Sequence, residues 1–226
     1  MEIIFLINFI KFVFNAVFMI IAISGKAGSG KSTVAKELAK RLKLRHYSIG
    51  DLMRRMARQK SISLLELSRL AEKDKKIDKE LDQMQINLGK KEKHFVIDGR
   101  LTAFFIPKAD AKIFLDCDDG VRAKRIIKDE RKDEKGRNLK EVIKQIRQRE
   151  QSERKRYKKY YNVDYYHKEL YDLVIDTTFK AVEEVVDDVM EFIELMNNPE
   201  LQVSIKKSKE DIKAGRIHKL REVLKK

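Results

Sequence analysis

The sequence has 226 residues, of which 42% are hydrophobic, so the chain as a whole is not disordered and is long enough for one α/β domain with a sizeable core or for two small domains. Its formal net charge is +15, and basic residues concentrate in segments 122–159 and 206–226. An anionic partner is therefore expected, either nucleotide phosphates or a polynucleotide. The single cysteine, Cys117, excludes an intramolecular disulfide and favours a reducing compartment, the cytoplasm, while the four scattered histidines give no zinc-ligand spacing.

The first 18 residues are apolar but are interrupted by Asn8, Lys11 and Asn15. A glycine-rich loop begins at Gly25, and a loop of this kind follows a buried strand, so residues 19–24 are assigned to that strand. The apolar residues that remain before this strand are fewer than the roughly 20 that a membrane span needs. We expect residues 1–18 to be an extension upstream of a translation start at Met19, with a membrane-associated helix as the alternative. Partnership with a membrane is not expected.

A glycine-rich segment, GKAGSGKST, follows this strand and precedes a helix with Val34, Leu38 and Leu42 on one face. It fits the pattern G-x-x-x-x-G-K-[ST] of a phosphate-binding loop. In such a loop the backbone N–H groups turn around an anion, the lysine reaches the β- and γ-phosphates, and the next hydroxyl ligates Mg²⁺. The predicted ATP-binding residues are Gly25, Lys26, Ala27, Gly28, Ser29, Gly30, Lys31, Ser32 and Thr33, with Lys31 also catalytic and Ser32 the ligand of Mg²⁺.

A helical insertion and further strands follow this helix. RHYSIGDLMRRMA supplies a short strand, a turn at Gly50 and a helix start, and Ser63 with Glu66 forms a capping box that opens a second helix running through DQMQ. Residues 50–93 all read as helical, and an insertion of this kind is a natural site for a phosphate acceptor. KHFVIDGRL, AKIFLDC and YDLVIDT are the later strands, and AVEEVVDDVMEFIELM is a closing helix.

The order of these segments resembles the cytidylate kinases, of the short archaeal type, within the P-loop nucleoside-monophosphate kinases. The segments that carry it are the P-loop, SIGDLMRRMA, AEKDKKIDKELD, DGRLTAFF, KIFLDCDDGVRAKRI, REQSERKRYKKYYNVD and YDLVIDTT, and they cover 19–196. The resemblance implies an α/β P-loop three-layer sandwich with a five-stranded parallel sheet, a helical monophosphate-binding insertion at 50–93 and a helical lid at about 129–160. It also implies Mg-ATP-dependent phosphorylation of CMP or dCMP, with ADP release, in pyrimidine nucleotide metabolism.

The resemblance also assigns residues to the acceptor. Arg54 is expected on the acceptor phosphate and Arg100 on that phosphate or on a pyrimidine edge, and Asp78 and Asp82 either contact the ribose or the cytosine amino group or belong to a solvated helix face. Asp98 either polarises a metal-bound water or caps its strand. The predicted acceptor-binding residues are Ser48, Gly50, Arg54, Asp78, Asp82, Asp98 and Arg100, whereas Arg55 is read as solvated.

Lid arginines are expected to close on the transferred phosphoryl group, where charge spreads over its equatorial oxygens. Arg149 and Arg156, in REQSERKRY, match the family motif and are predicted to be catalytic. Further lid candidates are Arg131 and Arg137, and Arg122 and Arg125 are expected to flank the adenine or the lid hinge. Most of the basic residues between 122 and 159 have a simpler reading, as the solvated face of a long helix.

Other features are predicted to be structural. Cys117 is expected to pack, and the tyrosines at 157, 160, 161, 165 and 166 are expected to seat the lid helix on the core, with stacking on bases as the alternative because lysines lie between them. Leu101 stands where longer bacterial relatives carry an acidic residue, which removes one expected cytosine contact.

The basic segment 197–226 reads as a helical hairpin outside the resemblance, and the sequence does not assign its role. Two other functions remain open. The same fold could phosphorylate another acceptor (UMP, AMP or dephospho-coenzyme A), or the chain could be an ATP-regulated nucleic-acid-binding module that uses the basic lid and tail. The expected partners are ATP and CMP or dCMP, without nucleic acid, and the expected oligomeric state is a monomer.

Overall fold

The computed structural model describes residues 19–128 and 138–198. The predicted extension 1–18, the first part of the predicted lid with Arg131 and Arg137, and residues 199–226 of the basic tail lie outside the described residues. Among the described helices, none is long and apolar enough to cross a membrane. The chain divides into two units, and the unit of residues 16–187 contains all the strands described below. Of the other unit, the described part is Asp188–Asn198.

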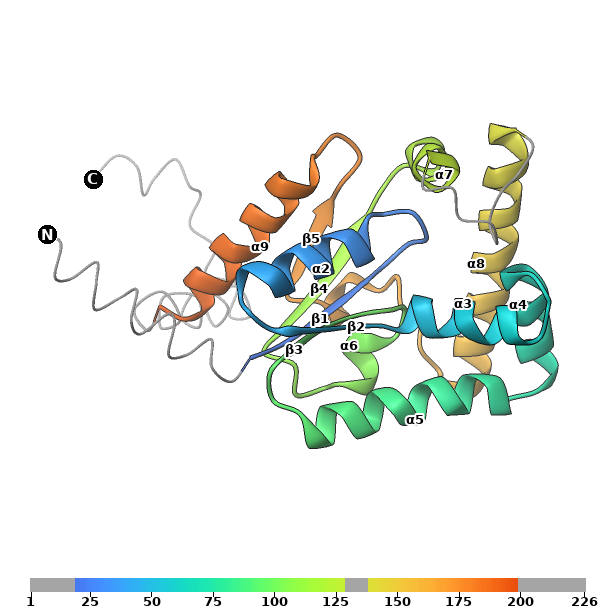
Figure 1. The fold of residues 1–226 in the computed structure, drawn as a ribbon, viewed down its shortest axis with the longest axis horizontal. Coiled ribbons are helices and arrows are strands. Elements are labelled where there is room, and N and C mark those ends of the chain that lie inside the picture. Colours follow the sequence, from blue (N-terminus) through green and yellow to red (C-terminus); the bar gives the residue numbers. More distant parts are fainter. Residues whose placement is uncertain (1–18, 129–137, 199–226) are drawn as a thin grey trace, which may run out of the picture. The chain divides into compact units, whose positions relative to one another are not determined.

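Five parallel strands form one sheet in the order β2-β3-β1-β4-β5 (Figure 1). The strands are β1 (Ile20–Gly25), β2 (Arg45–Ser48), β3 (Phe95–Asp98), β4 (Ala111–Asp116) and β5 (Leu173–Asp176). The central strand β1 is buried along its whole length, which explains why its sequence is a continuous apolar run. Because all strands are parallel, Ser48, Gly25 and Asp98 lie at one edge of the sheet, where ligands bind in such folds.

Helices cover both faces of this sheet, and the predicted three-layer sandwich is confirmed. The helix α2 (Lys31–Arg41) contacts β1, β2 and β3. On the other face, α5 (Lys76–Lys91) and α6 (Thr102–Phe105) pack with Leu88 and Ile106 against Phe95 and Ile97. The remaining helices are α3 (Ile49–Gln59), α4 (Leu64–Lys73), α7 (Asp119–Lys128), α8 (Leu139–Tyr161), the 3-10 helix η3 (Lys168–Leu170) and α9 (Val182–Met196), which crosses the boundary between the two units.

The insertion consists of α3, α4 and α5, with an apolar cluster of its own around Met53, Leu67 and Leu81. The predicted capping box is confirmed, since Ser63 Oγ accepts from the Glu66 N–H and the Glu66 carboxylate accepts from the Ser63 N–H. The prediction of one continuous helix after Ser63 is wrong. The chain is extended at Asp74, whose Oδ1 accepts from the Lys76 N–H at 2.9 Å, so this carboxylate starts a separate helix, α5.

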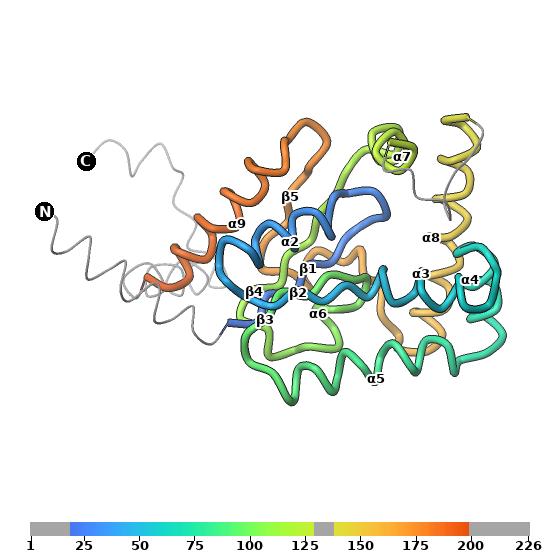
Figure 2. The backbone as a smooth tube through the Cα atoms, viewed as in Figure 1, coloured from blue at the N-terminus to red at the C-terminus, as the bar shows by residue number. Residues whose placement is uncertain are grey.

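The long helix α8 contacts α4 and α7, and Figure 2 shows it beside α4. Asn138 caps its beginning, and Asn162, in the left-handed conformation, ends it. Tyr157 and Tyr165 are buried with Phe114 of β4, and Tyr161 and Tyr166 pack around them. Four of the five predicted tyrosines therefore pack around Phe114, whereas the Tyr160 hydroxyl donates to the carbonyls of Ala71 and Glu72 in α4.

Candidate active site

The loop between β1 and α2 has the backbone geometry of a phosphate cradle. A Cβ atom on Gly25 would lie 2.2 Å from the Leu115 carbonyl oxygen, and one on Gly28 would lie 2.7 Å from the Arg122 carbonyl oxygen. Both positions also have positive φ, so only glycine fits without strain. The first helical N–H groups of α2 follow at Gly30 and Lys31, where the helix dipole favours an anion.

Lys31 is buried at the first position of α2, and its ammonium group donates to the backbone carbonyl of Lys26 within the same loop. Burial, and secondly the charge of Arg100, hold the pKa of Lys31 well below its ordinary value. Negative charge on a bound phosphate would oppose both effects and favour the charged lysine. Lys26 itself pairs with Asp116 at 2.7 Å.

Asp98, at the end of β3, joins three elements. Its Oδ2 accepts from Ser32 Oγ at 2.8 Å and from Ser48 Oγ at 3.2 Å, and its Oδ1 lies 2.7 Å from His46 Nε2. The carboxylate is almost fully buried, so its hydrogen-bond partners compensate its desolvation. The predicted alternative of a simple strand cap does not describe this arrangement, because Asp98 connects α2, β2 and β3 beside the phosphate loop.

Ser32 and Asp98 have the donor set that Mg²⁺ prefers, oxygen atoms from a hydroxyl and a carboxylate. Mg²⁺ commonly binds to proteins through one or two such groups and completes its octahedron with substrate phosphates and water. The 2.8 Å hydrogen bond between the two side chains places both oxygens at the N-terminus of α2, beside the phosphate loop. The residues present therefore fit this cation.

Arg100 follows β3 and lies between the phosphate loop and the lid helix. Its Nη1 donates to the Gly25 carbonyl at 2.8 Å, and its Nε donates to Glu153 Oε2 at 2.8 Å. Glu153 also accepts from Arg149 Nε at 3.0 Å. Burial alone would raise the pKa of Glu153, but Arg100 and Arg149 outweigh it and lower the pKa to about 2.

Arg54 projects from the first turns of α3 over the backbone of Gly50, where a Cβ atom would lie 3.5 Å from its Nη1. Its guanidinium pairs with Asp51, and its side chain is mostly buried, whereas Arg55 is exposed. Ser48 caps the same helix by accepting from the Asp51 N–H at 3.3 Å. The structure therefore distinguishes the two adjacent arginines as the sequence reading did.

Asp78 and Asp82 lie on the same face of α5, but neither is solvated. Asp78 Oδ2 lies 3.1 Å from Arg156 Nε, and Asp82 accepts a hydrogen bond from the Tyr161 hydroxyl. Burial raises the pKa of each carboxyl group to about 6, although Arg156 opposes this at Asp78 and Tyr161 opposes it at Asp82. Arg156 also donates to the Ser68 carbonyl at 2.8 Å, so it joins α8 to α4 and α5.

One pocket brings most of the predicted residues together. Its cationic side chains are Lys31, Arg54, Arg100 and Arg149, and its apolar walls include Ile49, Met53 and Leu81. The other predicted residues that line it are Ala27, Gly28, Ser32, Gly50, Asp78, Asp82 and Asp98. Ser48 contributes through Asp98, and Arg156 is buried behind Asp78 rather than in the lining. Gly25, Lys26, Ser29, Gly30 and Thr33 belong to the phosphate loop and the start of α2 without lining this pocket.

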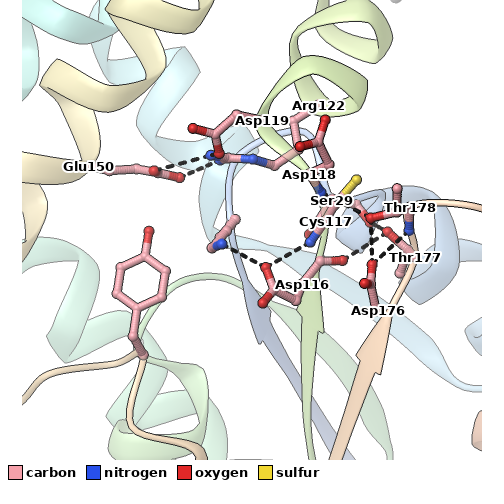
Figure 3. A network of polar contacts seen from close by, with 12 residues as sticks. Ser29, Asp116, Cys117, Asp118, Asp119, Arg122, Glu150, Asp176, Thr177 and Thr178 are labelled. Atoms are coloured by element: carbon pink, nitrogen blue, oxygen red, sulfur yellow. Dashed lines mark hydrogen bonds and ion pairs between the residues drawn. The ribbon is translucent and has the colours of Figure 1, made fainter.

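A second polar network supports the phosphate loop from the β4 and β5 side (Figure 3). Thr177 Oγ1 donates to the Ser29 carbonyl at 3.0 Å, and Arg125 donates to the Thr177 carbonyl at 2.6 Å. Arg122 is buried, donates to the Ala27 carbonyl at 3.1 Å and pairs with Glu150 of α8. Arg122 and Arg125 therefore connect α7 and α8 to the loop, and Cys117 is buried beside them as predicted.

The sequence reading missed three contributors to the site. Glu153 is hidden by the reading of this segment as a solvated helix face, although its spacing of four from Arg149 and three from Arg156 indicates a shared face of α8. His46 gave no signal, because its contact with Asp98 spans 52 residues. Gln85 lies one turn beyond Leu81 on the pocket side of α5. The helical spacing of residues 78, 81, 82 and 85 indicates that they share one face of α5, and this spacing could have identified Gln85.

The parallel sheet, the glycine loop and the arginine-lined pocket define a P-loop kinase. Residues 20–179 match the profile of the cytidylate kinase-like family. The cytidylate kinase of Archaeoglobus fulgidus is 39% identical over 177 residues, which cover 78% of this chain and 96% of that protein. The cytidylate kinase of Methanocaldococcus jannaschii is 41% identical over 180 residues, 78% of this chain and 98% of that protein. The chain belongs to the cytidylate kinase-like family.

Solved structures agree with this fold. A protein of Eubacterium ventriosum, described as uncharacterized, superposes with a TM-score of 0.59 at 22% identity, covering 78% of this chain and 98% of that one. The shikimate kinase of Bacteroides thetaiotaomicron gives a TM-score of 0.55 at 16% identity, with coverages of 78% and 99%. At these identities the similarity concerns the fold alone.

Proposed function

We propose that this protein is a cytidylate kinase, which transfers the γ-phosphoryl group of Mg-ATP to CMP or dCMP and releases ADP. The family match and the relatives named cytidylate kinases support the acceptor. The observation that carries the proposal is the single pocket in which Lys31 and the start of α2 face Arg54, Arg100 and Arg149. A kinase of this kind must hold two phosphates together, one on the donor and one on the acceptor.

The donor binds at the phosphate loop in this proposal. The loop N–H groups and Lys31 bind the β- and γ-phosphates, and Ser32 and Asp98 would hold Mg²⁺. When bound, the cation neutralises negative charge on the β- and γ-phosphate oxygens. Asp98 keeps Ser32 oriented through their hydrogen bond.

The acceptor phosphate binds to Arg54 and Arg100, which orient one of its oxygens toward the γ-phosphorus. This oxygen is anionic at pH 7, so the transfer needs no strong general base. A new bond forms between it and the γ-phosphorus as the bond from that phosphorus to the β–γ bridging oxygen breaks. ADP leaves with the bridging oxygen, and Arg149 stabilises the charge on the transferred group. Arg156 acts from behind Asp78 by fixing α8 to the insertion.

Three further expectations stay predictions. Cytoplasmic location depends on the single cysteine, and no residue described above bears on the expected monomeric state. The absence of a nucleic-acid partner concerns the basic tail, most of which lies outside the described residues.

The test is an ADP-release assay of the full chain with Mg-ATP and, separately, CMP, dCMP, UMP, AMP, GMP and dephospho-coenzyme A. We expect CMP or dCMP to have the highest kcat/KM. A preference for another acceptor would contradict the assignment of the acceptor while leaving the kinase intact. ATP binding without turnover of any acceptor would contradict the kinase itself and favour the nucleic-acid-binding alternative.

A further inference from the structure

Gln85 is buried in the wall of the candidate acceptor pocket with an unused hydrogen-bond acceptor. Its side chain is 3% exposed, lines the pocket from α5, and has no hydrogen-bond partner at Oε1. A buried polar atom without a partner costs free energy, so such atoms point to a ligand that supplies the missing bond. Since no described protein group donates to this oxygen, a donor on a molecule within the pocket would supply that bond.

The orientation of the amide follows from its other atom. Gln85 Nε2 donates to the Leu81 carbonyl at 3.4 Å, one helical turn earlier. Exchanging the two ends of the amide would bring two carbonyl oxygens together at this point, so the hydrogen bond keeps Oε1 as the atom without a partner. The pocket therefore presents a neutral acceptor in a fixed position.

The two carboxylates nearest in sequence on this face already have partners. Asp78 pairs with Arg156, and Asp82 accepts from Tyr161. Leu101, which follows Arg100 in the lining, has no polar side-chain atom. Gln85 Oε1 is thus a neutral side-chain acceptor of this lining for which no hydrogen-bond partner is found among the described residues.

The rest of the lining indicates which part of a nucleotide meets Gln85. The cations at Lys31, Arg54 and Arg100 suit phosphates, and the apolar side chains of Ile49, Met53 and Leu81 suit the faces of a base. A base held between apolar side chains is read by polar atoms at its edge. Gln85 Oε1 requires a donor there, and the exocyclic amino group of cytosine is one, whereas uracil has a carbonyl oxygen at the same position.

We propose that Gln85 is the residue that selects cytosine over uracil, because its Oε1 accepts a hydrogen bond from the 4-amino group of CMP. The inference rests on the proposed function, since it names the base contact of that same pocket. Uracil would place a second acceptor against Oε1, and a base without a 4-substituent would leave Oε1 unpaired.

The test compares kcat/KM for CMP, UMP and the 4-deamino analogue of CMP in the wild type and in Gln85→Met, which keeps the length of the side chain. In the wild type we expect CMP to exceed the analogue by about 10- to 100-fold, the usual effect of one lost buried hydrogen bond. In Gln85→Met this advantage should fall to within about threefold, mainly through a lower value for CMP. Gln83→Met is the matched control, because Gln83 is exposed on the same helix and pairs with Asn87.

The outcomes separate the two claims. An unchanged ratio of CMP to analogue in Gln85→Met, in a variant with wild-type ATP affinity, would overturn the inference and leave the kinase standing. A loss of the ratio in Asp82→Asn alone would assign the amino group to Asp82 and would also overturn it. If Gln85→Met does not fold, Gln85→Glu, which keeps an acceptor, must retain the preference for CMP over the analogue. No turnover of CMP by the wild type would contradict the proposed function itself.

Discussion

Arg100 Nε donates to Glu153 Oε2 at 2.8 Å, and through this contact the end of β3 is joined to the lid helix α8. The same carboxylate holds Arg149, so two arginines of the pocket share one fully buried counter-ion. A buried carboxylate between two guanidinium groups fixes their positions, and removing it leaves two buried charges uncompensated. We therefore expect Glu153 to act as a positioning residue for Arg100 and Arg149.

Glu153→Gln should impair the binding of CMP more than the binding of ATP. We expect KM for CMP to rise about 10-fold or more, with a smaller change in KM for ATP, because Arg100 and Arg149 lose their common partner. Initial rates at varied CMP and varied ATP measure this difference. Glu80→Gln, on the exposed face of α5, is the control, and equal increases in both KM values would argue for a general loss of structure instead.

The loss of stability caused by Glu153→Gln should depend on pH. The pKa of Glu153 is about 2 in the folded protein and near 4.5 in the unfolded chain, so its contribution is complete above pH 5 and is lost as pH falls toward 2. The difference in Tm between wild type and Glu153→Gln should be largest at pH 5 to 7 and shrink at pH 3. A difference that stays constant over this range would show that the carboxylate is not held ionised.

The contribution of Asp82 to stability should depend on pH in the opposite direction to that of Glu153. Burial raises its pKa to about 6, so the folded state binds more protons than the unfolded state between about pH 4 and 6, and stability falls as pH rises through this window. Asp82→Asn removes this titration. We expect the variant to lose less Tm than the wild type between about pH 4 and 6.5, measured by thermal unfolding, and parallel curves would contradict the assignment.

Arg54 and Arg55 offer a matched pair, because they are adjacent and only Arg54 lines the pocket. Arg54→Met should raise KM for CMP by about 10- to 100-fold, since a charge-assisted contact to phosphate is lost. Arg55→Met should leave KM within about twofold. Equal effects of the two substitutions on KM would remove Arg54 from the acceptor site.

Asp98→Asn tests the cation site. An amide still accepts from Ser32, but it lowers the negative charge beside the helix N-terminus, so more Mg²⁺ should be needed for half-maximal rate. We expect a shift of about 10-fold in that concentration at saturating ATP. Asp118→Asn, which changes an exposed carboxylate at the start of α7, should cause no shift, and a lower maximal rate with unchanged Mg²⁺ dependence would contradict the role.

Local patterns predicted much of this molecule. The phosphate loop, the capping box at Ser63 and the five strands depend on residues close together in the sequence, so their spacing carried the information. The break at Asp74 was missed because the apolar periodicity of α4 continues into α5, and only the capping carboxylate marks the boundary. Local sequence patterns therefore predicted which residues form each helix or strand, but they did not predict which residues of other elements those residues contact.

The partners that organise the site are distant in the sequence. Glu153 meets Arg100 across 53 residues, and His46 meets Asp98 across 52. On α8 the charges look like those of a solvated helix. The resemblance singled out Arg149 and Arg156, but the packing of α8 against α4 and α7 was needed to show that Glu153 faces inward with them. Contacts of this kind form only when folding brings distant segments together, so local sequence patterns do not predict them.

The central claim is most directly tested by following the γ-phosphate itself. The full chain is incubated with γ-labelled ATP, Mg²⁺ and CMP, and the labelled products are separated. We predict label in CDP, with transfer reduced by at least about 10³-fold in Lys31→Met and unchanged in Lys36→Met, whose lysine is exposed on the same helix. Label found only in inorganic phosphate, or equal transfer by Lys31→Met, would contradict the account.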